Sequence, residues 1–165
     1  MSTLKTTNIQ HPSAASPAVE LTAAGGLWLG GGKVLQVVRA TDSSLRSTTS
    51  VAYVDSGMTI SITPQKSDSA ILVALIVDAS PQAGTLNFMD VAITDNSNNV
   101  LTSTGTGSAS TNNSAANVHL WGYSTPATTS ATTYKARFSM SGTGATAYFR
   151  NQVHTGQMYA LEISA

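Results

Sequence analysis

Apolar and polar positions in the middle of the chain follow a pattern that predicts β-strands. Residues Met58–Ile62 alternate between apolar and polar side chains, as expected for a half-buried strand. Residues Ala70–Val77 form an unbroken apolar run, which is typical of a strand buried on both faces. Val51–Val54 predicts a short strand before them. Turn residues separate these segments, at Asp55–Gly57, Pro64–Asp68 and Ser80–Pro81.

Further strands are predicted on both sides of this central block. They are Lys33–Thr41, Thr85–Thr94, Asn117–Tyr123, Thr133–Met140, Ala145–Arg150 and Gln157–Ile163. No segment shows a convincing helical period. About nine short strands separated by turn-rich segments are typical of a β-sandwich or jelly roll. We therefore expect an all-β, β-sandwich or jelly-roll-like domain over residues 33–165, with antiparallel strands.

Four finer expectations concern the register and the connections of these strands. A bulge near Phe88–Met89 would allow two apolar sets of one strand to face the core. Ser141–Gly144 is expected to form a hairpin turn. Leu101–Ala116 is expected to form a long polar loop, because it has little to bury. The last strand is expected to point three side chains inward, namely Tyr159, Leu161 and Ile163.

Residues 1–32 differ from the rest of the chain and are expected to form an extended N-terminal arm. They are polar, contain two glycine clusters and show little periodicity, although Val19–Leu21 could add a short edge strand. Such an arm would lie either on its own domain or on a neighbouring protein. The apolar trio Leu27, Trp28 and Leu29 is the natural docking point in both cases, because a large aromatic side chain buries much area.

Composition narrows the functional classes. The chain has 165 residues, of which 10% are charged, against about 25% in typical domains. Its formal net charge is zero, which argues against a nucleic-acid-binding protein and against a polybasic membrane anchor. It has no cysteine and therefore no disulfide or zinc–thiolate site. No signal peptide or membrane-spanning run is expected from the apolar pattern.

The sequence carries no persuasive catalytic motif. The histidines His11, His119 and His154 are widely spaced, so a metal site that combines them with Asp90 is conceivable but not supported. The run Gly30–Lys33 lacks the remaining residues of a phosphate-binding loop. No G-x-S-x-G elbow is present. The strand carboxylates Asp90 and Glu162 could form a glycosidase pair only if the fold brought them close together. We expect no enzyme activity and no cofactor.

The aromatic residues Trp121, Tyr123 and Tyr148 are more informative. Each falls on a strand face opposite the best apolar set. They could form a second core face, a subunit interface, or a site that stacks on a carbohydrate or receptor.

Two stretches resemble proteins of tailed phages. The opening STLKTTNIQHPSAASPAVELTAAGG resembles a leader on virion proteins of marine and cyanobacterial phages. The block STTSVAYVDSGMTISITPQKSDSAILVALIVDAS, together with TAYFRNQ and YALEIS, resembles a β-sandwich domain of phage tail fibres and other virion surface proteins. Fibre proteins usually carry a repetitive shaft before such a head, and this chain has none.

The resemblance implies a structural component of the virion that contacts other virion proteins and forms a homo-oligomer, with a trimer favoured. A capsid decoration or knob protein anchored by its arm is the expected function. The alternative is a tail-fibre or receptor-binding module that recognises a glycan on the host surface. The resemblance supplies no catalytic residue, cofactor or metal ligand to carry over.

Overall fold

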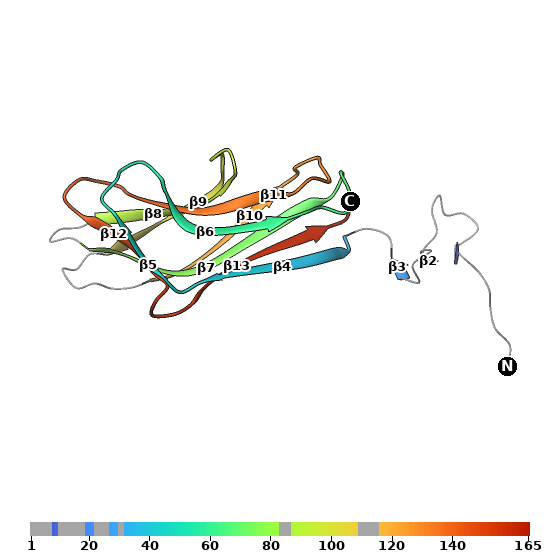
Figure 1. Ribbon diagram of the computed structural model, residues 1–165, viewed down its shortest axis with the longest axis horizontal. Helices are drawn as coiled ribbons and strands as arrows, with labels where there is room; N and C mark the ends of the chain where they lie inside the picture. Colours follow the sequence, from blue (N-terminus) through green and yellow to red (C-terminus); the bar gives the residue numbers. More distant parts are fainter. Residues whose placement is uncertain (1–7, 10–18, 22–26, 30–31, 83–86, 109–115) are drawn as a thin grey trace.

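The computed structural model describes residues 8–9, 19–21, 27–29, 32–82, 87–108 and 116–165. Side-chain positions are described for residues 32–82, 88–104 and 116–165. Ten strands in this part of the chain build one sandwich (Figure 1). They are β4 (Val34–Asp42), β5 (Leu45–Thr48), β6 (Val54–Ile62), β7 (Ala70–Gln82), β8 (Asn87–Asp95), β9 (Val100–Ser108), β10 (Ala116–Ser124), β11 (Thr132–Met140), β12 (Thr146–Arg150) and β13 (Gly156–Ile163).

The strands pair in a nested order, with the first of them against the last. Strand β4 pairs with β13, and β5 pairs with β12. The consecutive strands β4 and β5 thus act as one interrupted strand, and β12 and β13 act as another. Moving inward along the sequence, β6 pairs with β11, β7 with β10, and β8 with β9, all antiparallel. This nested antiparallel ribbon, wrapped into two sheets, is the jelly-roll topology. The expectation of an all-β jelly-roll-like domain is confirmed.

Wrapping the ribbon creates two layers that pack face to face. One sheet has the order β10–β7–β13–β4, with β12 and β5 continuing β13 and β4 along the far half of β7. The other has the order β6–β11–β8–β9. Figure 1 shows the two layers along the long axis of the domain. The ends of the sandwich sequence lie side by side, because the Ser164 N–H donates to the Lys33 carbonyl at 2.9 Å.

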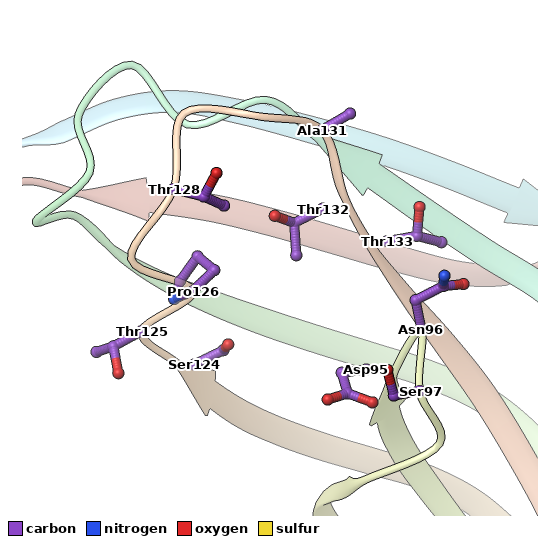
Figure 2. A pocket seen from close by; sticks show the side chains of 10 residues that line it. All are labelled: Asp95, Asn96, Ser97, Ser124, Thr125, Pro126, Thr128, Ala131, Thr132 and Thr133. Carbon is purple, nitrogen blue, oxygen red and sulfur yellow. The ribbon is translucent and has the colours of Figure 1, made fainter.

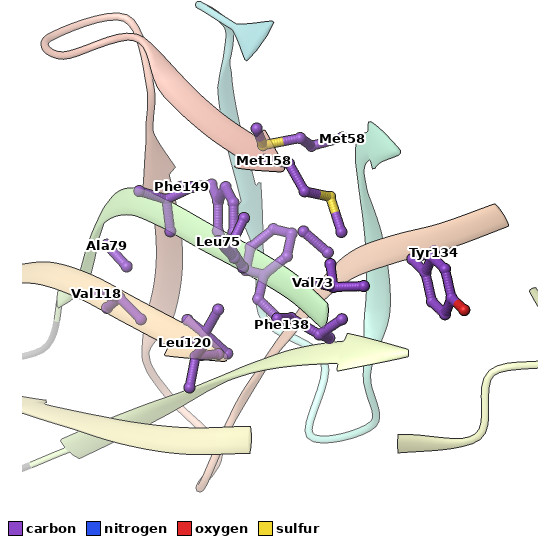
Figure 3. Close-up of a cluster of buried hydrophobic side chains, with 14 of the residues drawn as sticks. Met58, Val73, Leu75, Ala79, Val118, Leu120, Tyr134, Phe138, Phe149 and Met158 are labelled. Carbon is purple, nitrogen blue, oxygen red and sulfur yellow. The ribbon is translucent and has the colours of Figure 1, made fainter. Parts of the chain in front are cut away.

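The core lies between these layers and is built from the inward residue of each alternating pair. The predicted set Met58, Ile60 and Ile62 is buried, as the alternation requires. Phe138 of β11 and Phe149 of β12 meet across the layers with ring centroids 5.0 Å apart (Figure 3). Burial of each such large apolar side chain contributes about 1.5–3 kcal/mol to stability.

The N-terminal segment contributes three short strands whose backbones pair with one another. They are β1 (Asn8–Ile9), β2 (Val19–Leu21) and β3 (Leu27–Leu29), and they form a separate antiparallel sheet with β2 in the middle. The expected strand at Val19–Leu21 is therefore present. Apart from Gly32, the rest of the predicted arm lies outside the described residues. The described part of the chain contains no helix that could span a bilayer.

The segment Asp55–Gly57 corrects one predicted turn. These residues lie inside β6, where the pairing with β11 shifts register between Lys135 and Arg137. Gly57 adopts a φ of 79°, and the Ser56 hydroxyl donates to the Ala136 carbonyl at 2.7 Å. The turn-forming residues thus make a bulge rather than a chain reversal. Ser80–Pro81 was also expected to be a turn, but it lies within β7.

The connections around β8 and β12 differ from the expectations as well. Phe88 and Met89 form no bulge, because the pairing is regular there and Phe88 simply points to solvent. The first half of the predicted loop Leu101–Ala116 instead belongs to edge strand β9, through backbone pairing that its small residues permit. Ser141–Gly144 is not a hairpin turn, since β11 and β12 belong to different sheets.

The last strand, β13, has the opposite facing to the one expected. Its buried residues are Met158, Ala160 and Glu162, whereas Tyr159, Leu161 and Ile163 are half-buried on the outer face. Both sets are largely apolar, so the alternation alone could not choose between them. The buried carboxylate is acceptable because hydrogen bonds satisfy it, as described below.

Candidate interaction surface

The outer face of the β10–β7–β13–β4 sheet carries many apolar side chains, and no other element of the sandwich covers it. Register places its outward side chains in three rows that cross all four strands. The rows are Tyr123–Leu72–Leu161–Val37, Trp121–Ala74–Tyr159–Arg39 and His119–Ile76–Gln157–Thr41. We refer to these three rows as the apolar face. The first two rows are apolar apart from Arg39, whereas the third row carries polar side chains beside Ile76.

The two edges of the apolar face are its most exposed parts. On β10, Trp121 is 60% and Tyr123 63% exposed, and on β4 Val37 is 58% exposed. The residues of β7 and β13 between them are buried or half-buried. On the β4 side, the Arg39 guanidinium lies 5.9 Å from the ring centroid of Tyr159. The face therefore has an aromatic edge and a cationic edge.

The outer face of the other sheet is polar. Asp55 of β6 pairs with two cations of β11, at 2.7 Å from Arg137 Nε and 3.7 Å from Lys135 Nζ. Hydroxyl groups continue this face, and Ser61 and Thr133 hydrogen bond to each other at 2.7 Å. Such paired charges and hydroxyls suit contact with water. The two outer faces of one sandwich thus have different chemistry.

A polar hollow of about 430 Å³ lies at the end of the sandwich where the β8–β9 turn meets the β10–β11 loop (Figure 2). Hydroxyl side chains dominate its lining, together with Asp95 and Asn96. Asp95 Oδ2 accepts from the Asn99 side chain at 2.7 Å, and Asp95 Oδ1 accepts from the Asn99 N–H at 2.8 Å. Asn99 chiefly holds the pKa of Asp95 below its ordinary value, although burial opposes this. Asp95 is thus an ionised cap of the turn rather than a proton donor.

A smaller hollow of about 220 Å³ borders the apolar face, next to the loop between β12 and β13. His154 Nδ1 lies 2.5 Å from Asp78 Oδ2 there. The Asp78 side chain is buried, whereas that of His154 is exposed. The contact holds the β12–β13 loop against β7.

The structure tests the three predicted aromatic residues unequally. Trp121 and Tyr123 lie together on β10 and point to solvent, so the reading of them as a second core face is wrong. Tyr148 shares the outer side of the same sheet, but it pairs with Ser80, six residues along β7 from Ala74, the partner of Trp121. That spacing puts it about 20 Å away along the strand. The guanidinium of Arg150 instead lies over the Tyr148 ring, 5.5 Å from the ring centroid.

The predicted anchor residues Leu27, Trp28 and Leu29 form β3, and their backbones pair with β2. Their side chains lie outside the described residues, so the anchor role stays a prediction. His11 also lies outside the described residues.

The remaining candidate residues are not brought together. His154 pairs with Asp78 rather than with Asp90, and His119 is exposed on β10. Asp90 is half-buried on β8, in one sheet, and Glu162 is buried on β13, in the other. No cluster of three or more potential metal-binding side chains occurs in the described part of the chain.

Glu162 is a structural carboxylate. It accepts from Gln36 Nε2 at 2.6 Å and from the N–H groups of Gln65 and Lys66 at 2.8 and 3.2 Å. Burial by itself would raise the pKa of Glu162, but these hydrogen bonds outweigh it and the pKa lies below its ordinary value. Glu162 therefore stays ionised and fixes the loop after β6 to the end of the sandwich.

Sequence reasoning missed the β7, β13 and β4 side chains of the apolar face. A usable signal was present, since a run apolar on both faces of β7 requires a cover for each face. The sandwich supplies the cover for only one of them. Leu72 and Ile76 of that run therefore lie on the face that the sandwich leaves uncovered.

Comparison with known proteins adds a likeness of fold. No family model matches the chain, and no curated protein matches its sequence. A mutant VP2 protein of infectious bursal disease virus in T=1 particles is similar over 91% of this chain, with 11% identity and a TM-score of 0.42. The VP2 subviral particle of the same virus is similar over 91% of this chain, with 12% identity and a TM-score of 0.35.

The alignment covers only part of the VP2 chains. The chain spans 41% and 42% of the length of these VP2 chains. At such identities the likeness concerns the fold alone. The jelly-roll assignment itself rests on the strand pairing described above.

Proposed function

We propose that this chain is a structural subunit of a tailed-phage virion, a capsid decoration or knob protein that is anchored through its N-terminal arm. The observation that carries the proposal is the contrast between the two outer faces of the sandwich. One is polar and carries paired charges, and the other is the apolar face with Trp121 60% exposed. Such a contrast suits a subunit that turns one face to water and the other to a neighbour.

Two further features support an assembly function. The net charge of zero and the low charged fraction fit a protein kept soluble within a larger particle. The resemblance of the opening segment and of the sandwich sequence to phage virion proteins favours the particle of a tailed phage. In this proposal the chain is a homo-oligomer, with a trimer favoured, and contacts other virion proteins. It needs no cofactor and catalyses no reaction.

The arm provides the test of this proposal. Virions are produced with the full chain and with a chain that lacks residues 1–29, and the purified particles are assayed for the protein by mass spectrometry. We expect the truncated chain to fold, with a circular dichroism spectrum and a melting temperature close to those of the full chain, but to be missing from the particles. Incorporation of the truncated chain at normal levels would contradict the anchoring function.

A second candidate function is glycan recognition on the host surface. The exposed pair Trp121 and Tyr123, and the hydroxyl-rich hollow at the nearby end of β10, favour it. Binding to a glycan array that is lost on Trp121→Ala, in a variant with an unchanged melting temperature, would support this function. An array without signal would leave the aromatic pair to subunit contact.

A further inference from the structure

We propose that the apolar face packs against another copy of this chain, related to the first by a rotation axis parallel to the strands. In this arrangement the β10 edge of one subunit lies against the β4 edge of the next. The inference rests on the proposed assembly function and deepens it by naming the partner of the face.

The two edges of the apolar face are different and complementary. The middle row begins with the Trp121 ring on β10 and ends with the Arg39 guanidinium on β4. Three strand spacings separate these residues, which is about 14 Å within one subunit. A guanidinium and an indole ring attract each other when they meet. Here they can meet only between subunits.

The position of Arg39 at one edge of the apolar face favours one direction of the rotation axis. An axis parallel to the strands reverses the order of the strands in the facing copy, so Trp121 faces Arg39 and Tyr123 faces Val37. An axis across the strands would instead set β4 on β4 and bring two Arg39 side chains together. Like charges in a closing interface cost free energy, so the parallel axis is favoured.

The apolar face carries little formal charge. Arg39 is the only Lys, Arg, Asp or Glu side chain in the three rows of the apolar face. Closing the face on a second copy therefore removes little ionic surface from water. The free-energy cost of desolvating charged groups, which opposes burial of a surface, is correspondingly small. The chain as a whole has zero formal net charge, so two copies do not repel each other at long range.

A charge exchange tests the inference directly. The full chain, Trp121→Lys, Arg39→Glu and the double variant are compared by sedimentation equilibrium over a range of concentrations. We expect the full chain to form a dimer or trimer. Trp121→Lys sets a cation opposite Arg39 of the neighbour and should weaken association by at least about 30-fold, as for a hot-spot aromatic. Arg39→Glu should weaken it less.

The double variant supplies the decisive result. It places opposite charges across the proposed contact and should recover at least about 10-fold of the lost association. The two positions are too far apart within a subunit to compensate there. Thr59→Lys, which adds the same charge to the polar face of β6, is the matched control and should associate like the unmodified chain.

Three results would overturn the inference: a full chain that is monomeric, association that Trp121→Lys leaves unchanged, or a double variant no better than Trp121→Lys. The particle assay separates this failure from failure of the proposed function. If the full chain is monomeric but Trp121→Lys is excluded from virions, the face contacts another virion protein. The assembly function would then stand without the self-association.

Discussion

At the scale of single residues, the buried carboxylate of Glu162 shows how hydrogen bonds allow a charged group in the interior of the sandwich. Glu162 is fully buried at the end of β13, where an apolar residue would be expected. Three donors, one from Gln36 and two from the backbone of the loop after β6, make this position a site for an ionised carboxylate. Its negative charge therefore contributes to holding that loop in place.

We predict that Glu162→Gln lowers the free energy of unfolding by about 1.5–3 kcal/mol near neutral pH, because it removes hydrogen bonds to a charged group. The pKa of Glu162 is lowered in the fold, so its contribution is present above the ordinary glutamate pKa. It is lost as the pH falls through the lower value of the folded protein. The difference between the two proteins should therefore shrink in acid.

Urea unfolding at a series of pH values measures this difference. Asp90→Asn, on a half-buried strand carboxylate for which no hydrogen bond of this kind is found in the described residues, is the control and should change stability less. A pH-independent difference between Glu162→Gln and the unmodified chain would contradict the role of the charge.

At the scale of single strands, the β-bulge in β6 has a sequence that resembles a turn. In β6, Gly57 adopts a φ of 79° inside a strand, and the bulge lets Met58, Ile60 and Ile62 face the core beyond it. A bulge inserts an extra residue and so sets which side chains point inward. The same three letters, Asp-Ser-Gly, would suit a chain reversal equally well, and for this reason the sequence predicted a turn.

We predict that Gly57→Ala destabilises the protein by about 1–3 kcal/mol. A side chain at positive φ costs about 1 kcal/mol, and a Cβ there would lie 2.9 Å from Arg46 Nη2. That guanidinium would have to move from Asp42, to which it is paired at 3.3 Å. Gly144→Ala is the matched control, because its φ is 85° with nothing within 4 Å. Thermal unfolding should show Gly57→Ala to be the worse of the two, and equal losses would contradict the contribution of Arg46.

The whole molecule is organised by the difference between its two outer faces. The apolar face holds the exposed Trp121, and the opposite face holds the Asp55 ion pairs. In the proposed function, this asymmetry lets the chain exclude water on one side and remain hydrated on the other. Incorporation into a particle and packing against a second copy would both bury the apolar face and leave the polar face in water.

We predict that Trp121 reports assembly through its fluorescence. In a Trp28→Phe variant it is the only tryptophan, because the chain has two. Burial against a second subunit should shift its emission to shorter wavelength at high concentration, and dilution should reverse the shift as the indole meets water. A Trp121→Phe variant, which retains Trp28, controls for changes in the arm. Emission that stays at long wavelength at all concentrations would contradict burial of this ring.

Most of the strands and much of the core follow from the sequence, because the alternation of side chains along a strand is a local property, whereas the edge strand β9 does not follow from it. Neighbouring residues alone predict that Met58, Ile60 and Ile62 point inward, and that His119, Trp121 and Tyr123 lie on the opposite side of their strand. What the tertiary structure decided was everything that depends on partners distant in the chain. It paired β13 with β4 and β7, buried Glu162 in place of Tyr159, and crossed from one sheet to the other at Ser141–Gly144. It also left the apolar face uncovered, since whether an apolar side chain meets protein or water is fixed only when all the layers have packed.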